Sequence, residues 1–277
     1  MKKKLPRVTI AIATFNRKKV LEWSAKSLYA SNLSCADIRI RIYDDKSSEY
    51  DADFLWGLFP TATSIIINSV NKKADLNTYD MYVDFLKTED DYFFNADSDI
   101  IYEKEWLSYA INHIGKTDGI LSLFNTKNHL SIGITEDELF EIKKDLGAAG
   151  TFFTRQRLQQ FIELEDCDSK KHIDWGFSEF YQKKGYKLLA AKKSLVQHIG
   201  LIGQNSVMFM TDFGKGFVID NLVNGQILND LIEDLLETQK EATENFIEEK
   251  LNNSKAYQLG NIILAPIRFI LQKTKKN

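Results

Sequence analysis

The sequence has few cysteines and no long apolar run. Its 277 residues include two cysteines, Cys35 and Cys167, whose separation fits no metal-site motif. Two isolated cysteines exclude a disulfide framework as the basis of the fold and are typical of a reducing compartment. No apolar segment is long enough to span a bilayer. These absences predict a cytoplasmic protein.

A strong net charge is also missing. The chain carries 36 Lys and Arg against 39 Asp and Glu, a formal net charge of -3, which gives no support for a nucleic-acid binder. The start is basic, as in a signal peptide, but the apolar run from Val8 to Ala13 is short and meets a polar turn, so we do not expect secretion. With 44% hydrophobic residues, the chain has enough apolar material for a sizeable core.

The apolar pattern of the first hundred residues predicts an α/β layer. Strands are expected at residues 8–13, 38–43 and 63–67 and in the run that begins at Asp91, with helices around residues 20–28 and 76–86. The order strand-helix-strand-strand-helix-strand is typical of a mostly parallel sheet. Ligands of such sheets bind beyond the carboxyl ends of the strands.

Polar clusters stand at those expected strand ends. They are Thr14 to Arg17, Asp44 to Ser47, Asn71 to Asn77, and Asp97 to Asp99. Any one of them could be an ordinary loop, because loops are polar, but four at one edge favour a binding site. No Gly-x-Gly-x-x-Gly follows the first strand, which disfavours a dinucleotide-binding enzyme.

The pair Asp97 and Asp99 is the main metal-site candidate. Side chains alternate along a strand, so the two carboxylates point the same way if the backbone stays extended. They then repel each other unless a cation lies between them, and a divalent metal that holds a diphosphate would supply that cation. The alternative is an acidic turn in which one aspartate caps a helix near Glu103.

Three of these segments resemble a known family. Val8 to Arg17, Tyr43 to Ser47, and Asn95 to Asp99 are similar to the amino-terminal half of a family-2 inverting glycosyltransferase of the GT-A fold, of the bacterial surface-polysaccharide type. That family has a first strand ending in a Thr-Tyr/Phe-Asn-Arg-like turn, a second ending in Asp-Asp-x-Ser, and then Asp-x-Asp. The resemblance covers roughly residues 7 to 200.

The resemblance implies a fold and a set of site residues. The fold would be a single Rossmann-type sheet flanked by helices. The nucleotide-sugar would contact Thr14, Phe15, Asn16, Arg17, Asp44, Asp45, Asp97 and Ser98. Asp97 and Asp99 would hold Mn²⁺ or Mg²⁺ against the donor diphosphate. The segment from Asn71 to Asn77 lacks the glycine and arginine of the family, so Lys73 is the candidate for a phosphate-facing cation.

The second chemical cluster runs from His172 to Tyr186. In the resembling family an acid at the start of such a helix deprotonates the acceptor hydroxyl, and the count back from Gly185 places this base at Asp174. Asp174 could instead only cap the helix. Trp175 would offer a stacking face to a sugar ring, and Glu179 is the second candidate for the base.

Residues 125–206 contain further segments for which the sequence predicts a loop, a helix start or a ligand contact. Residues 125–134 are expected to form a polar loop and Thr135 to begin a helix. The small residues from Gly147 to Thr151 suit either a plain loop or a close approach of a ligand. The resemblance implies that His198 contacts the metal or the diphosphate, and residues 201–206 would close over the donor, with Gly200 and Gly203 as hinges.

The chain changes character near Val218. We predict a catalytic domain at residues 1–215 and a helical extension at residues 216–277. The extension begins as an acidic amphipathic helix that either packs on the domain or pairs with a second copy. After Lys255 no acidic residue remains, and the basic, apolar tail favours a peripheral contact with an anionic membrane over docking on protein.

The sequence thus predicts a metal-dependent hexosyltransferase. It would move a sugar from a nucleotide-sugar, in particular a UDP-sugar, to a glycan or lipid-linked saccharide in polysaccharide biosynthesis. A carboxylate base near the acceptor and a metal at the leaving diphosphate are what an inverting transfer requires. The alternatives are a nucleotidyltransferase, although its glycine-rich loop is missing, and a non-catalytic carbohydrate-binding scaffold on the same fold.

Overall fold

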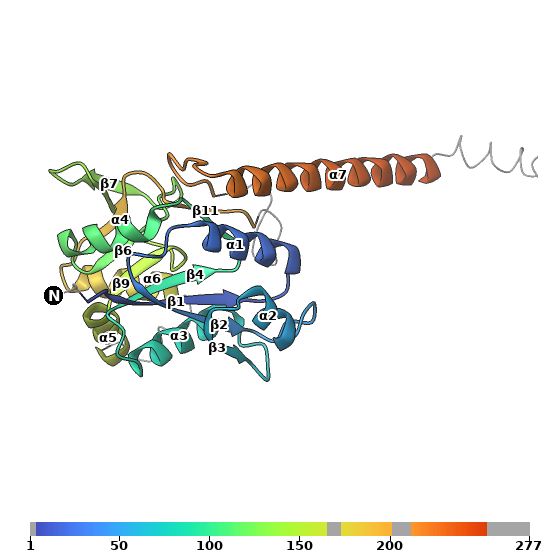
Figure 1. Cartoon of the computed structure of the whole chain (residues 1–277). Coiled ribbons are helices and arrows are strands. Elements are labelled where there is room, and N and C mark those ends of the chain that lie inside the picture. Colours follow the sequence, from blue (N-terminus) through green and yellow to red (C-terminus); the bar gives the residue numbers. More distant parts are fainter. Residues whose placement is uncertain (1–3, 165–172, 201–211, 254–277) are drawn as a thin grey trace, which may run out of the picture. The chain divides into compact units, whose positions relative to one another are not determined.

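The computed structural model describes residues 4–164, 173–200 and 212–253 (Figure 1). The chain divides into two compact units, residues 1–225 and residues 226–277. The first is the mixed α/β layer that the sequence predicts, a large central sheet flanked by helices. The described part of the second unit, residues 226–253, is helical.

Among the described residues, the sheet of the first unit has nine strands in the order β3-β2-β1-β4-β9-β6-β10-β8-β7, and β5 and β11 form a separate pair. The strands are β1 (Arg7–Thr14), β2 (Asp37–Asp44), β3 (Ala62–Ile67), β4 (Tyr92–Asp97), β5 (Ile100–Tyr102), β6 (Ile120–Ser122), β7 (Ser131–Ile134), β8 (Phe140–Lys143), β9 (Thr151–Thr154), β10 (Leu188–Ala191) and β11 (Val196–His198). The helices are α1 (Lys18–Ala30), α2 (Ala52–Leu58), α3 (Lys73–Leu86), α4 (Trp106–His113), the 3-10 turn η1 (Ile114–Lys116), α5 (Arg155–Leu164), α6 (Ile173–Lys183) and α7 (Leu222–Asn253).

The parallel half of the sheet brings the polar strand ends together. Strand β1 lies between β2 and β4 and runs parallel to both. In its register Thr14 pairs with Asp44, and Ala13 pairs with Asp97. The turn after β1, the loop after β2 and the acidic pair after β4 therefore meet at one edge, as the pattern of strand ends predicts.

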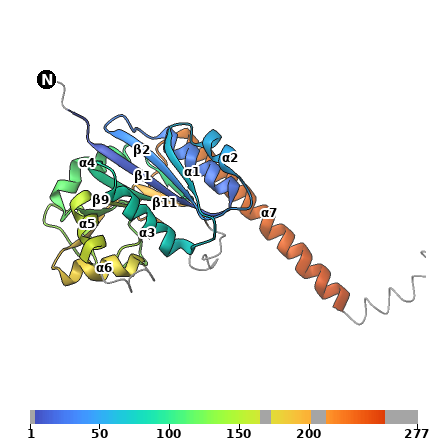
Figure 2. The same ribbon diagram turned by 90° about the horizontal axis from the view of Figure 1, so that it is seen from below.

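The alternation of side chains along the strands supplies two cores. On one face, Ile10 and Phe94 belong to a buried cluster that includes residues of α1 and α4. On the other, Phe93 packs with α3, α5 and α6, and Figure 2 shows these three helices together. The ring of Tyr82 meets the rings of Phe93 and Phe153 edge-on. Both faces of β4 are therefore covered, which explains why its first three residues, Tyr92 to Phe94, are all aromatic.

Two expectations from the sequence are wrong. The sequence predicts no helix between the second and third strands, but helix α2 separates β2 from β3. The start of α2 is capped by the Asp51 carboxylate, which accepts a hydrogen bond from the Phe54 amide at 2.9 Å. Thr135 does not begin a helix. Its amide donates to the Phe140 carbonyl at 3.0 Å, closing a turn between β7 and β8, so part of the expected polar loop is a strand.

A strand follows the acidic pair, so neither Asp97 nor Asp99 stands at the start of a helix. Strand β5 begins directly after Asp99 and pairs antiparallel with β11, with Ile100 opposite His198. This short ladder joins a segment near residue 100 to one near residue 198.

No helix among the described residues combines the length and the apolar character that a bilayer crossing requires.

Candidate metal centre

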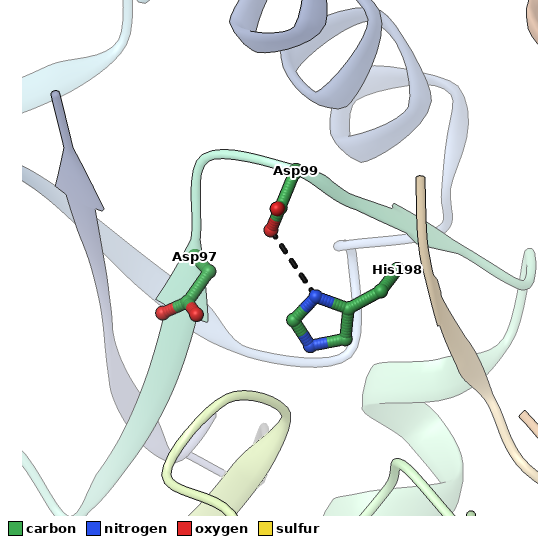
Figure 3. Close-up of side chains that lie close together, drawn as sticks. All are labelled: Asp97, Asp99 and His198. Carbon is green, nitrogen blue, oxygen red and sulfur yellow. Dashed lines mark ion pairs between the residues drawn. The ribbon is translucent and has the colours of Figure 1, made fainter. Parts of the chain in front are cut away.

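Three potential metal ligands converge beyond the end of β4. Asp97 is the last residue of that strand, and Asp99 follows two residues later, just before β5. The pairing of β5 with β11 places His198 beside them, and the Ile199 amide donates to the Asp99 carbonyl at 2.8 Å. In Figure 3 the Asp99 carboxylate points toward the His198 ring, and the Asp97 side chain lies beside them. The residues that the sequence suggests as metal ligands therefore do meet.

The geometry of this cluster fits a divalent cation. One ligand atom from each of Asp97, Asp99 and His198 lies within 4.8 Å of the other two. His198 Nδ1 stands 3.2 Å from Asp99 Oδ1 as an ion pair, yet that buried oxygen has no hydrogen-bond partner within the described part of the chain. Two carboxylate oxygens and one imidazole nitrogen form a donor set that suits Mn²⁺ and, less well because of the nitrogen, Mg²⁺.

The pKa values of the cluster are shifted in different directions. Burial, together with the charge of Asp99, raises the pKa of Asp97 to about 6. Burial also opposes ionisation of Asp99, but the charges of His198 and Arg17 outweigh it and hold the pKa of Asp99 well below its usual range. Burial would lower the pKa of His198, but Asp99 and Asp97 raise it to about 9. The protein thus keeps positive charge at this site when no metal is bound.

Arg17 belongs to this centre. The resemblance places it in the nucleotide pocket, and in the structure it lies in a left-handed turn with φ of 55°. Its Nη1 donates to Asp99 Oδ2 at 2.9 Å, and its Nη2 to Ser98 Oγ at 3.3 Å. The turn after β1 therefore supports the acidic loop directly.

Gly200 is required by the same packing. A Cβ atom at this position would lie 2.0 Å from Asp99 Oδ2 and 2.6 Å from Arg17 Nη1. Only glycine allows such an approach of the backbone. The sequence suggests Gly200 as a hinge. The structure gives a steric reason for glycine at this position and does not test the hinge. The expected closing loop of residues 201–206 and its second hinge, Gly203, lie outside the described residues.

Hydrogen bonds join the turn after β1 to the loop after β2. Asn16, which has a φ of 52°, accepts a hydrogen bond at Oδ1 from the Ser48 amide at 2.8 Å, and its own amide donates to Ser47 Oγ at 2.8 Å. Ser47 in turn donates to Asp44. Thr14 contacts the Tyr50 hydroxyl, and Phe15, beside it, is half-buried. Hydrogen bonds thus join the strand ends of β1 and β2 into one polar network, called here the polar floor.

Asp45 has a different environment from Asp44. Its carboxylate accepts hydrogen bonds from Asn68 Nδ2 at 2.9 Å, from the Lys72 amide at 2.7 Å and from the Lys73 amide at 2.8 Å. It holds the start of α3, whose first residue, Lys73, has a φ of 67°. The Lys73 side chain is exposed. The structure therefore joins Asp45 to Lys73 through the backbone of Lys73.

The proposed base lies on α6. Asp174 occupies the first turn of this helix, and its side chain lies outside the described atoms. The Ile173 amide donates to Asp75 Oδ1 at 2.9 Å, which fixes the start of α6 against α3. Trp175 is 65% exposed. The Glu179 side chain is 68% exposed and pairs with Lys183 at 2.7 Å, so the structure brings it to solvent and not to the metal centre.

Asn95 is a buried polar residue of β4 that the sequence patterns did not single out. It interrupts the apolar run of β4 and shares a strand face with Phe93 and Asp97. The residue is fully buried, and neither Oδ1 nor Nδ2 has a hydrogen-bond partner among the described residues. The signal that could have found it is an amide inside an otherwise apolar strand.

Comparisons with known proteins identify the fold. The mannosyltransferase PcManGT from Pyrobaculum calidifontis, in complex with GDP-Man and Mn²⁺, matches with a TM-score of 0.52 and 14% identity over 68% of this chain. TarS of S. aureus matches with a TM-score of 0.50 and 13% identity over 69% of this chain. The chain has a GT-A-like fold. The match spans 55% and 36% of those two proteins. No model of a known family and no curated protein sequence matches the chain.

Proposed function

We propose that the protein is a metal-dependent inverting glycosyltransferase. The observation that carries the proposal is the cluster of Asp97, Asp99 and His198 at the carboxyl end of β4 in a GT-A-like sheet. A polar floor of the β1 and β2 strand ends lies at the same edge. A nucleoside-diphosphate sugar requires both features: a cation site for its diphosphate and a polar surface for its nucleoside.

In this proposal the residues divide the work. Asp97, Asp99 and His198 hold Mn²⁺ or Mg²⁺, which when bound neutralises the departing diphosphate. Arg17 orients Asp99 through an ion pair and donates a second hydrogen bond to Ser98. Asp174 accepts the proton of the acceptor hydroxyl as general base, with Glu179 as the second candidate.

The proposed donor is a nucleotide-sugar, in particular a UDP-sugar that carries a hexose. Its nucleoside would lie on the floor built by Thr14 to Arg17 with Asp44 and Asp45. Lys73 and Trp175 are exposed, so they are free to meet a phosphate and a sugar ring. PcManGT, which has the same fold, is described with GDP-Man and Mn²⁺. The proposed acceptor is a growing glycan or a lipid-linked saccharide of a cell-surface polysaccharide.

We also propose a location for the enzyme. It would act in the cytoplasm at the inner face of the cell membrane, where a lipid-linked acceptor is accessible. The support is the sequence after Lys255, which combines basic and apolar residues without an acidic one. Residues 254–277 lie outside the described part of the chain. A chain truncated after Lys255 is expected to lose its binding to anionic liposomes.

A thermal-shift screen tests the proposed function. Nucleotide-sugars are added with and without Mn²⁺, and at least one is expected to raise the melting temperature in a metal-dependent way. The Asp97→Ala variant is expected to lose this shift and the metal-dependent hydrolysis of the donor. A wild-type protein that no donor stabilises would overturn the proposal. Donor binding without any turnover would favour the carbohydrate-binding scaffold, and turnover of a nucleoside triphosphate would favour a nucleotidyltransferase.

A further inference from the structure

A histidine and an aspartate form a second polar pair outside the metal centre. His129 lies in the segment between β6 and β7, and its Nδ1 bonds the Asp145 carboxylate, with side chains that are 24% and 16% exposed. A carboxylate only accepts hydrogen bonds, so Asp145 holds a proton on Nδ1. In a neutral imidazole the lone pair then stays on Nε2. The pair thus presents Nε2 as a hydrogen-bond acceptor of fixed orientation.

The sheet brings this pair to the edge that holds the metal centre. Strand β9 is antiparallel to both β4 and β6, so β4 and β6 run the same way and end at the same edge. Asp97 ends β4, and the segment with His129 leaves β6 at that edge. Just before β9, the Gly150 amide donates to the Asn95 carbonyl at 2.9 Å. Asp145 precedes this contact by five residues, so both members of the pair belong to the ligand-binding edge of the sheet.

Asp212 connects the two histidine sites. Its carboxylate accepts a hydrogen bond from Thr126 Oγ1, three residues before His129. Its carbonyl accepts one at 3.3 Å from the side chain of Gln197, which precedes His198 in β11. Burial raises the pKa of Asp212, and the charges of His129 and His198 oppose this shift. Both imidazoles therefore lie close enough to act on one carboxylate.

The second ring nitrogen of His129 is available to a ligand. Nε2 makes no hydrogen bond with any residue that the structure describes, and it is not one of the buried atoms that lack a partner. Solvent therefore reaches it. A Cβ atom at Gly147 would lie 3.3 Å from Nε2, so a larger residue there would crowd this side of the ring. The small residue that the sequence shows at position 147 keeps room at Nε2.

An uncharged hydroxyl suits this position better than a phosphate. Asp145 already supplies the counter-charge of the imidazole, and Asp212 adds a second carboxylate close by, so a further anion would gain little. A sugar hydroxyl donates to Nε2 without bringing a charge. Saccharides carry many such groups, and a buried carboxylate–histidine pair can orient one of them.

We propose that His129, oriented by Asp145, binds a sugar hydroxyl through Nε2 beside the metal centre. The inference rests on the proposed function, because the metal centre is what would bring a nucleotide-sugar to this edge. The hydroxyl belongs to the donor hexose or to the acceptor saccharide. Asp145 is then a positioning residue that acts through His129.

Two amide variants separate ligand binding from a structural role. In His129→Asn the amide nitrogen can take the place of Nδ1 and keep the contact with Asp145, whereas in His129→Gln it can take the place of Nε2. Calorimetry with Mn²⁺ compares UDP-glucose, UDP-N-acetylglucosamine and GDP-mannose with bare UDP and GDP. If the donor supplies the hydroxyl, His129→Asn is expected to bind the nucleotide-sugar about tenfold more weakly and the bare nucleotide equally well. His129→Gln is expected to recover part of this loss.

The acceptor arm uses p-nitrophenyl glycosides. If the acceptor supplies the hydroxyl, His129→Asn is expected to bind and hydrolyse the donor like the wild type, while the KM for the glycoside rises by about tenfold. His113→Asn is the matched control. His113 Nδ1 donates to the Tyr109 carbonyl at 2.8 Å, and the residue precedes β6, at the opposite edge of the sheet. This control is expected to match the wild type in both assays.

The outcomes distinguish this inference from the proposed function. A wild type that binds no nucleotide-sugar overturns the proposed function and this inference with it. Wild-type donor binding together with a His129→Asn variant that binds and transfers normally overturns this inference alone. So does an equal loss of affinity for the nucleotide-sugar and the bare nucleotide, which would give His129 a purely structural role. An unchanged affinity for Mn²⁺ shows that each variant keeps the metal centre.

Discussion

Arg17 Nη1 donates to Asp99 Oδ2 at 2.9 Å, although 82 residues separate them in the sequence. The contact joins the turn after β1 to the acidic loop after β4. It neutralises part of the charge of Asp97 and Asp99 when no cation is bound. A cation at the same place would take over this task, so Arg17 and the metal should partly replace each other in their effect on stability.

The Arg17→Ala variant tests whether Arg17 and the metal stabilise the same carboxylates. Without metal, Arg17→Ala leaves Asp97 and Asp99 with His198 as their counter-charge among the described residues. The free energy of unfolding should then fall by about 1 kcal/mol, because the guanidinium is partly exposed. With saturating Mn²⁺ the loss should shrink. Denaturant unfolding with a chelator and with Mn²⁺ measures both values. An equal loss in the two conditions would contradict the shared role.

Gly200→Ala should disturb the metal centre without touching a ligand. The added Cβ would lie 2.0 Å from Asp99 Oδ2, so the carboxylate or the backbone has to move. We expect the affinity for Mn²⁺ to fall by about 10- to 100-fold, as for other changes around metal ligands. Isothermal titration calorimetry gives this affinity. Gly57→Ala in α2 is the control, since open space surrounds Gly57 and alanine favours a helix; it should bind Mn²⁺ like the wild type.

Asn95→Leu should leave the free energy of unfolding unchanged or raise it. The Asn95 amide is fully buried without a hydrogen-bond partner among the described residues, so leucine removes an unsatisfied polar group. Asn77→Leu is the matched control. The Asn77 amide accepts from Asn68 Nδ2 at 3.0 Å and donates to the Tyr43 carbonyl at 3.1 Å. Its loss should cost about 1–3 kcal/mol. Equal destabilisation in both variants would mean that Asn95 has a partner.

The affinity for the metal should depend on pH. The pKa of His198 is raised to about 9, chiefly by Asp99 against the effect of burial, and the pKa of Asp97 is raised to about 6 by burial and Asp99. Metal binding needs the unprotonated imidazole. Between pH 9 and pH 6 the affinity should therefore fall as pH falls, by up to about tenfold per unit, and more steeply below pH 6. Titration with Mn²⁺ in a pH series measures this slope, which His198→Asn should flatten above pH 6.

The sequence predicts the parallel half of this fold and the meeting of its strand ends. The reason is local, because Val8 to Ala13 and the run before Asp97 are apolar enough to be buried strands, and a parallel sheet then sets where they end. The contacts that complete the centre are not local. Ile100 pairs with His198, and Asp45 binds the backbone at the start of α3. Neither pairing leaves a signature in the sequence of either segment. The β7–β8 hairpin was missed because its first strand is polar or exposed at most positions.

Asp174→Asn separates catalysis from donor binding. If Asp174 is the general base, its amide variant should still bind Mn²⁺ and the nucleotide-sugar, while transfer to the acceptor falls by about 10²- to 10⁴-fold. Glu179→Gln is the matched change, five residues further along α6. Because Glu179 is exposed and paired with Lys183, this variant should transfer at nearly the wild-type rate. Single-turnover assays and donor titrations on both variants measure the two quantities. A large loss in Glu179→Gln together with full activity in Asp174→Asn would move the base to Glu179.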